Sequence, residues 1–249
     1  MSKPTLNEKS RIYWQNRIEL HDKKVEKDTL KLEKQLKKIF VDTGKEIKKE
    51  LAYFYVNNTD ITKYENYRLE ATLQAIYIVL DTLFNKEEEK LNKRLVETYI
   101  DTYKYFDKLL IINTSFETIN IGLVEQVVKT NWSGLSFSER IWENRRKLAL
   151  TIKEELKKGL IRGESLQEMS RIMSDKLNNE YSNTLRLIRT EIAWIQCEAT
   201  KQNYLDNDIK YYEISAFLDN RTSKICKSMD GEVVNVKEAV VGKNMPPFH

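Results

Sequence analysis

The sequence contains few cysteines, prolines, glycines and histidines, and the first two shortages bear on the class of protein. Its two cysteines are too few for a disulfide framework, which favours a reducing compartment. The 249 residues include only seven glycines and three prolines, and the prolines are Pro4, Pro246 and Pro247. Because no proline lies between these two ends, the chain can form long helices along most of its length.

Long apolar segments are also absent. The longest uninterrupted run is AIYIVL, residues 75–80, whereas a membrane-spanning helix needs about 20 apolar residues. The first residues, MSKPTLNEKSRIYWQNR, lack the apolar core of a signal peptide. These shortages predict a soluble protein that is made in the cytoplasm and has no membrane partner.

Charge is nearly balanced over the whole chain but not along it. The formal net charge is +4, and residues 1–56 contain 14 Lys+Arg against 9 Asp+Glu. A basic region of this size can bind nucleic acid without sequence preference, because it releases counterions from the phosphates. Acids are interspersed with the lysines throughout, and no aromatic interleaving sharpens the basic patch, so a solvated helix face is the alternative interpretation.

The first half of the chain is predicted to be helical. Apolar residues recur at helical spacing between residues 17 and 55, with an interruption near Gly44, and two further helices fit residues 69–83 and 91–110. A stretch rich in Ser, Thr and Asn, residues 113–137, then resets the pattern. We therefore predict an elongated helical region over residues 1–125, followed by a second region over residues 126–249.

The second region begins with three predicted helices. One covers residues 141–156 and closes at Gly159 or Gly163, and another starts at Ser165, where Glu168 completes a capping box. A third covers residues 185–199. The segment KYYEISAFLD, residues 210–219, alternates between apolar and polar, and turn residues follow at positions 219–220 and 230–231. The predicted fold is mainly α, with a small α+β C-terminal module in which helices pack on a short β element.

The second half resembles the phage minor head proteins, the head-morphogenesis or Mu F-like family. The segments that carry the resemblance are SFSERIWENRRKLAL, GLIRGESLQEMSRIM, LIRTEIAW, LDNRTSKICKSMDGE and GKNMPPFH, in this order between residues 136 and 249. The signature positions that it marks, with structural roles implied, are Arg189, Thr190, Glu191, Asp219, Arg221, Thr222, Ser223, Cys226, Asp230, Gly231, Pro246, Pro247 and His249.

The resemblance implies a portal-associated protein of low copy number that acts in head assembly and in DNA packaging or ejection. Its implied partners are the portal protein, capsid or scaffold proteins, double-stranded DNA without sequence preference, and further copies of itself. Its implied location is the virion, in the capsid interior or at the portal vertex, with the host cytoplasm as the site of assembly. No catalytic residue and no cofactor are implied. The family motif continues after the histidine with Pro-x-Cys-Arg, so we expect either that this end is truncated or that this member lacks the final Cys.

Two kinds of chemistry are conceivable at the terminal cluster. Cys226 and His249 could bind zinc, with Asp219 or Asp230 as a further ligand, although structural zinc needs four ligands and no CxxC pair occurs. Alternatively, Cys226 could be a nucleophile with His249 as its base. The simpler interpretation is that Cys226 is a small buried residue beside a turn.

Other chemical interpretations are weaker than structural ones. The RTE segment, residues 189–191, is faintly similar to the Arg-Ser-Glu motif of ADP-ribosyltransferases, but it lies on a predicted helix, where Arg189 would pair with an acid such as Asp219 and Arg221 would cap a carbonyl. Trp132, Trp142 and Trp194 are predicted to be core or helix-packing residues rather than base-stacking platforms, and His21 to be solvated. The rival functions are a DNA-binding protein acting through its basic helices and an enzyme related to toxins.

Overall fold

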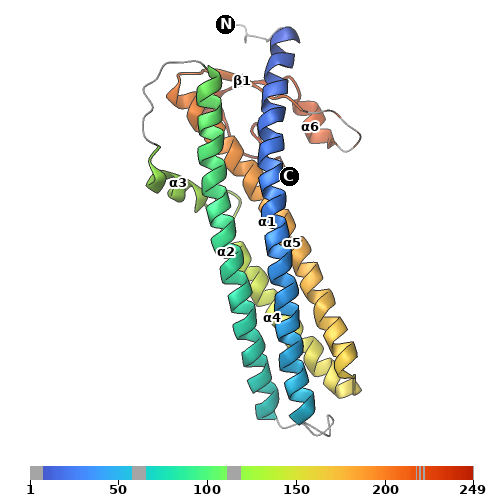
Figure 1. The fold of residues 1–249 in the computed structure, drawn as a ribbon. Helices are drawn as coiled ribbons and strands as arrows, with labels where there is room; N and C mark the ends of the chain where they lie inside the picture. The colour runs from blue at the N-terminus through green and yellow to red at the C-terminus, as the bar shows by residue number, and fades with distance from the viewer. Residues whose placement is uncertain are drawn as a thin grey trace. The chain divides into compact units, whose positions relative to one another are not determined.

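In a computed structural model, the structure describes residues 8–57, 66–110, 119–216, 218, 220 and 222–248. Within these ranges the chain forms six α-helices and two short β-strands (Figure 1). The elements are α1 (Glu8–Asn57), α2 (Asn66–Leu110), α3 (Ile121–Val128), α4 (Phe137–Arg162), α5 (Leu166–Asp206), β1 (Tyr211–Glu213), α6 (Lys224–Met229) and β2 (Val233–Asn235), with a 3₁₀ turn at Val236–Glu238. The predicted fold class, mainly α with a small C-terminal β element, is confirmed.

The helices are longer than the sequence pattern predicted. The two helices expected over residues 69–110 form the single helix α2, and those expected to begin at Ser165 and at residue 185 form the single helix α5. The interruption predicted near Gly44 is wrong, because α1 continues through it. An added Cβ at Gly44 would lie 3.5 Å from Leu177 Cδ1, an ordinary van der Waals contact, so the glycine is neither a break nor a required close approach.

The predicted helix ends are confirmed in detail. Helix α4 stops at Gly163, which adopts the left-handed conformation at φ 72°. At the start of α5, Ser165 Oγ accepts a hydrogen bond from Glu168 N at 3.2 Å, and Glu168 accepts one in return from Ser165 N at 2.8 Å. A second capping box, which the sequence reading missed, joins Ser136 and Glu139 at the start of α4.

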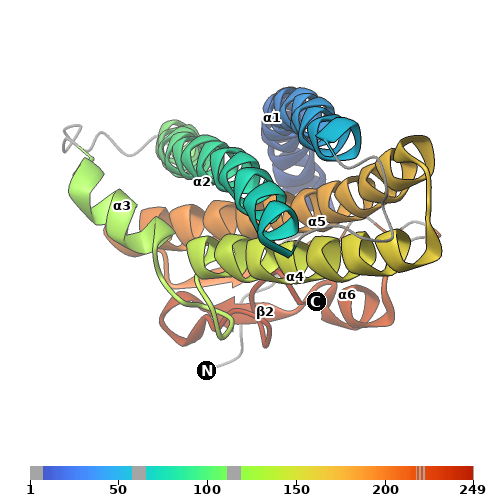
Figure 2. The same ribbon diagram turned by 90° about the horizontal axis from the view of Figure 1, so that it is seen from below.

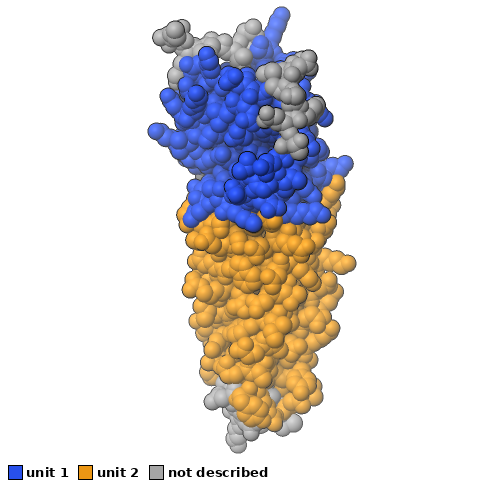
Figure 3. Space-filling view, turned by 90° about the vertical axis from the view of Figure 1, so that its left-hand side faces the viewer, with its two compact units in different colours: residues 1–29, 93–132, 189–249 blue, residues 30–92, 133–188 orange. Residues whose placement is uncertain are grey.

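The chain divides into two compact units, coloured separately in Figure 3. The helical unit comprises residues 30–92 and 133–188, and the terminal unit comprises residues 1–29, 93–132 and 189–249. Each unit is assembled from segments on both sides of residue 126. The units therefore group residues that pack together and are not continuous stretches of sequence. The division into regions 1–125 and 126–249 stays a prediction.

The helical unit is built from parts of α1, α2, α4 and α5. Figure 2 shows α1 and α2 foreshortened, with α4 and α5 running lengthwise across the view. Apolar stripes of the four segments meet in its core, and Leu36, Leu73, Leu80, Ile152 and Leu156 are fully buried there. Polar contacts at its edges fix the neighbours of each helix: Tyr181 Oη donates to the Glu33 carbonyl at 2.9 Å, and Arg145 Nε pairs with Asp81 at 2.7 Å. Burial of this apolar surface is the main source of its stability.

The terminal unit holds the β element. Strand β1 pairs with β2 in antiparallel register, with Tyr212 opposite Val234. Val233, Val234, Val236 and Met245 are buried with Ile195 and Ala199 of α5. The alternation seen in residues 210–219 thus produces only a three-residue strand, since a single partner strand covers one of its edges.

Candidate partner-binding site

The signature residue Asp230 connects three segments of the terminal unit. Its Oδ1 accepts a hydrogen bond from the Ala216 amide at 2.9 Å and from Arg11 Nη2 at 2.5 Å. Arg11 Nε also lies 3.1 Å from Glu213 Oε1 on β1. One guanidinium from the start of α1 therefore joins strand β1 to the turn before β2. Charge-assisted bonds of this kind are stronger than neutral ones.

The turn itself has the predicted chemistry. Gly231 adopts a φ of 82°, which favours glycine, and its amide donates to the Ile214 carbonyl at 2.8 Å. Ile214 in turn donates to the Glu232 carbonyl at 2.9 Å. Asp230 and Gly231 thus close the hairpin that brings β2 alongside β1.

Ser223 and Cys226 lie on the short helix α6. Ser223 is the N-cap, and its Oγ accepts from the Cys226 amide at 3.2 Å. The placement of Cys226 beside a turn is therefore wrong: it lies inside a helix, because a serine three residues earlier caps that turn. Its side chain is a half-buried free thiol, so it is less buried than the simple interpretation predicted.

The metal and nucleophile hypotheses for Cys226 remain predictions. Their second residue, His249, lies outside the described residues, as do Asp219 and Arg221. Among the residues that the structure does describe, no group of three or more His, Cys, Asp and Glu could hold a metal ion. Thr222 is half-buried beside α6.

The final segment folds back onto β1 and α5. Tyr212 Oη donates to the Asn244 carbonyl at 2.7 Å, and Lys201 Nζ donates to the Ala239 carbonyl at 3.1 Å. The peptide bond between Pro246 and Pro247 is cis. This end of the signature is therefore held by its backbone carbonyls, and by the Asn244 side chain, which accepts from Val240 N at 2.7 Å and donates to the Glu238 carbonyl at 3.0 Å.

The RTE segment lies on α5, as predicted, and its glutamate, Glu191, is buried and hydrogen-bonded. Glu191 is only 1% exposed and accepts a hydrogen bond from Trp132 Nε1 at 3.0 Å. The Trp132 ring stacks on Trp194, with centroids 5.4 Å apart and planes 9° apart. Arg189 is exposed and Thr190 half-buried, and the proposed partner Asp219 is not described. The structural interpretation of these tryptophans is confirmed.

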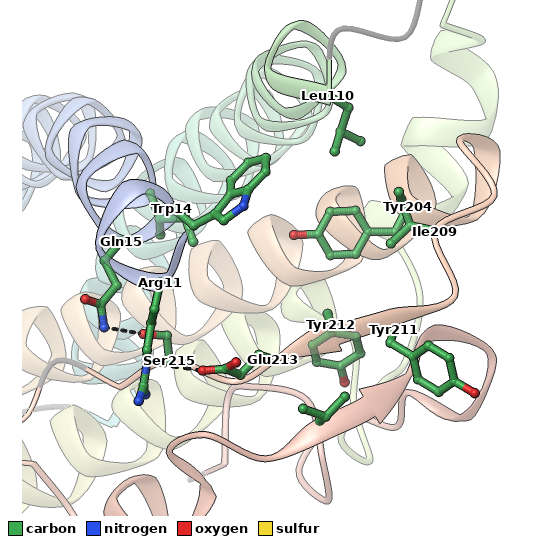
Figure 4. Close-up of a pocket in the computed structure, with 12 residues that line it drawn as sticks. Arg11, Trp14, Gln15, Leu110, Tyr204, Ile209, Tyr211, Tyr212, Glu213 and Ser215 are labelled. Carbon is green, nitrogen blue, oxygen red and sulfur yellow. Dashed lines mark hydrogen bonds and ion pairs between the residues drawn. The ribbon is translucent and has the colours of Figure 1, made fainter. Parts of the chain in front are cut away.

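A cavity of about 280 Å³ lies beside the Arg11 network (Figure 4). Trp14 of α1 and Tyr204 of α5 point toward each other across it, and Leu110 closes the α2 side. Residues of β1 form another wall. The sequence reading missed this cavity, because its walls come from segments that lie up to about 200 residues apart.

Comparison with known proteins identifies the second part of the chain. Residues 150–249 match the family described as Phage Mu protein F like protein. These residues belong to that family. The recognition as a phage minor head protein, made from the sequence, is confirmed, and a structural role in the phage head, hence in the virion, follows.

Two curated proteins are similar to most of this chain. One is the NAD(+)--arginine ADP-ribosyltransferase EFV of Enterococcus faecalis, 24% identical over 90% of this chain and 48% of the transferase. The other is Minor head protein GP7 of Bacillus phage SPP1, 25% identical over 90% of this chain and 77% of that protein. The chain thus spans about half the length of the transferase. No solved structure matches it.

The matched family residues include Asp230, Gly231 and Glu191, whereas Arg11 and Trp132 lie outside them. The residues that hold the signature in place are therefore drawn partly from the first half of the chain. No helix within the described ranges is long and apolar enough to cross a membrane.

His21 contradicts its predicted solvated position. It is 3% exposed, its Nε2 lies 2.9 Å from Thr102 Oγ1, and its ring stacks on Tyr105 at 4.5 Å. Burial, with a smaller contribution from Lys24, lowers the pKa of His21 to about 4. The signal was present in the sequence, since His21 precedes the buried Val25 by one helical turn.

Proposed function

We propose that this chain is a portal-associated minor virion protein that acts in head assembly and in DNA packaging or ejection by binding other virion proteins. The observation that supports the proposal is that signature side chains make hydrogen bonds within the protein. Asp230, Ser223 and Glu191 each make hydrogen bonds inside the terminal unit. Side chains so engaged fix the shape of a module, and this supports binding over catalysis.

The terminal unit also exposes apolar side chains. Leu218, Ile225 and Val240 are 61%, 49% and 53% exposed, and Tyr211 is exposed as well. These side chains all lie within residues 211–240, and exposed apolar side chains can serve as contacts to other proteins. We infer that this module contacts the portal or its neighbours in the capsid.

The test is capture of partners from a phage-producing lysate by the tagged full-length chain, followed by mass spectrometry. We expect portal and capsid components in stoichiometric amounts, and we expect Ile225→Ser to reduce their recovery. Ile161→Ser is the matched control, because Ile161 is equally apolar and is exposed on α4 of the helical unit. Recovery of nucleic acid alone, lost at moderate salt, would count against the proposal.

DNA contact through α1 is the second candidate. Lys27, Lys34 and Lys38 are exposed along this helix, whereas Lys23, Lys24, Lys45 and Lys49 pair with nearby carboxylates. Exposed lysines such as Lys27, Lys34 and Lys38 are the ones that could release counterions from DNA. A steep fall of affinity for duplex DNA with salt, made shallower by Lys27→Ser, Lys34→Ser and Lys38→Ser together, would support it.

We also propose that this chain is not itself a transferase, despite its similarity to the enterococcal protein. The buried position of Glu191 beneath Trp132 supports this, because a catalytic carboxylate must reach its substrate. Incubation of the purified chain with NAD⁺ and an arginine-containing acceptor should yield no modified arginine. Modification by the wild-type chain that Glu191→Gln abolishes, with folding retained, would refute the proposal.

A further inference from the structure

The cavity beside β1 has the composition of a peptide pocket. Its apolar walls are Trp14, Ile18, Leu110, Tyr204 and Ile209, and Tyr211 and Tyr212 add two more rings. Aromatic walls with a few polar groups at the rim are typical of sites that accept an apolar side chain and hydrogen-bond the backbone beside it. At about 280 Å³, the cavity has room for one or two side chains and not for a large cofactor.

Trp14 supplies an unused donor to this cavity. The indole N–H groups of Trp132 and Trp142 donate to Glu191 and Glu88 at 3.0 and 2.9 Å. Within the described part of the chain, Trp14 Nε1 has no such partner, although its ring lines the cavity. An indole N–H placed at an apolar pocket can be satisfied by a carbonyl oxygen of a ligand.

Strand β1 presents further unused backbone groups. Ile214 N donates to Glu232 O and Val236 N donates to Lys210 O, so Lys210, Tyr212 and Ile214 turn their backbone toward β2. In an antiparallel pair the intervening residues, Tyr211 and Glu213, turn theirs away. Both residues line the cavity, and among the described residues their amides and carbonyls make no backbone hydrogen bond outside the β1–β2 ladder. An unpaired strand edge of this kind can bind an extended peptide.

The charges at the rim select the class of ligand. Arg11 is held by two carboxylates, Glu213 and Asp230, so this cluster carries a net charge of −1. Such a cluster repels phosphate groups, which disfavours nucleic acid. It attracts a lysine or arginine that lies next to the apolar residue of a peptide.

We propose that this cavity and the free edge of β1 bind an extended segment of a virion protein that carries an aliphatic residue beside a basic one. The aliphatic side chain enters between Trp14 and Tyr204. A carbonyl of the segment accepts the Trp14 N–H, and its backbone pairs with Tyr211 and Glu213. This inference deepens the proposed function and rests on it, because it names the segment through which a virion partner is recognised.

The test uses the full-length chain labelled with ¹⁵N and a synthetic peptide, acetyl-Ser-Lys-Val-Leu-Val-Lys-Ser-amide. The chain has four tryptophans, and Trp14→Phe assigns the Trp14 indole signal by its disappearance. We expect this signal to shift on titration with the peptide. By fluorescence anisotropy of the labelled peptide, Trp14→Phe should bind about five- to tenfold more weakly, as expected for one lost hydrogen bond.

Matched controls separate the parts of the inference. Leu20→Ala, on the exposed side of the same helix and outside the cavity, should bind as the wild type does. A peptide with glutamates in place of its lysines, and one with N-methylated backbone amides, should each bind at least tenfold more weakly. A thermal melt of each variant checks its folding.

Several results would overturn the inference. These are an unshifted Trp14 signal, equal affinity of the N-methylated peptide, or competition by a single-stranded oligonucleotide. Portal capture without peptide binding would remove the pocket and leave the proposed function standing. Peptide binding without portal capture would instead remove the proposed function and leave the pocket.

Discussion

At the scale of single residues, this protein keeps several ionisable groups inside its cores. Glu87 of the helical unit is 1% exposed, and burial, reinforced by the nearby carboxylate of Glu180, raises the pKa of Glu87 to about 8. A carboxyl in such surroundings stays protonated at neutral pH. His21 of the terminal unit is correspondingly kept neutral. Sequence patterns show that these residues lie on helices but not that their surroundings exclude water.

The stability of the helical unit should therefore depend on Glu87 and pH. The folded pKa of Glu87, about 8, lies above the ordinary value of 4.5, so its stabilising contribution is complete below pH 4.5. That contribution is lost as the pH rises toward and through 8, by about 1.4 kcal/mol per pH unit. Glu87→Gln mimics the protonated acid, and we expect its advantage over wild type in urea unfolding to grow between pH 5 and pH 8.

The exposed neighbour Glu89 provides the control. Glu89→Gln removes the same charge from the same helix without changing a buried group, so its effect should vary little over this pH range. Equal pH dependence in wild type and Glu87→Gln would show that Glu87 ionises freely in the folded protein.

A second residue-scale prediction concerns Glu191, the buried carboxylate that accepts the hydrogen bond of the Trp132 indole. Glu191→Ala leaves the Trp132 N–H without its acceptor and opens space in the interior, so we expect a loss of about 2–3 kcal/mol in the free energy of unfolding. Glu191→Gln keeps an acceptor oxygen and should lose less. Denaturant unfolding followed by tryptophan fluorescence measures both, and an equal loss in the two variants would contradict the hydrogen-bond explanation.

At the scale of elements, helix type was predictable and helix extent was not. Apolar spacing located every long helix. Gly163 marked the end of α4, and the capping box of Ser165 and Glu168 marked the start of α5. The joining of predicted helices into α2 and α5 was missed because charged residues such as those at 86–90 carry no apolar signal yet form helix readily. The β element was predictable from alternation and from Asp230-Gly231. The contact of Arg11 with that turn was not, because no local pattern links residues so far apart.

Replacing Gly231 and Gly44 by alanine should change the free energy of unfolding in opposite directions. Gly231 has a φ of 82°, so Gly231→Ala should lower the free energy of unfolding by about 1–2 kcal/mol. Gly44 is helical and an added Cβ would make only an ordinary contact at 3.5 Å, so Gly44→Ala should raise it by roughly 0.5–1 kcal/mol. Thermal or urea unfolding of both variants checks the signs, and destabilisation by Gly44→Ala would mean that Leu177 cannot accommodate the methyl group.

At the scale of the whole molecule, the two ends of the chain stabilise each other within the terminal unit. Arg11 and Asp230 are 219 positions apart, and their side chains are only partly exposed. The family signature therefore depends for its shape on a helix outside the matched residues.

The last prediction follows from this long-range pair. Arg11→Ala and Asp230→Ala should each destabilise the terminal unit, and the double variant should lose less than the sum. A coupling of about 1–2 kcal/mol is expected for a partly exposed, charge-assisted contact. Urea unfolding of the four proteins measures the coupling. The parallel pair Lys24 and Asp101, exposed on the same unit at 2.9 Å, should show a coupling below about 0.5 kcal/mol, because solvent screens it. If both pairs coupled equally, Arg11 would be an ordinary surface charge, and the shape of the terminal module would not depend on the first helix.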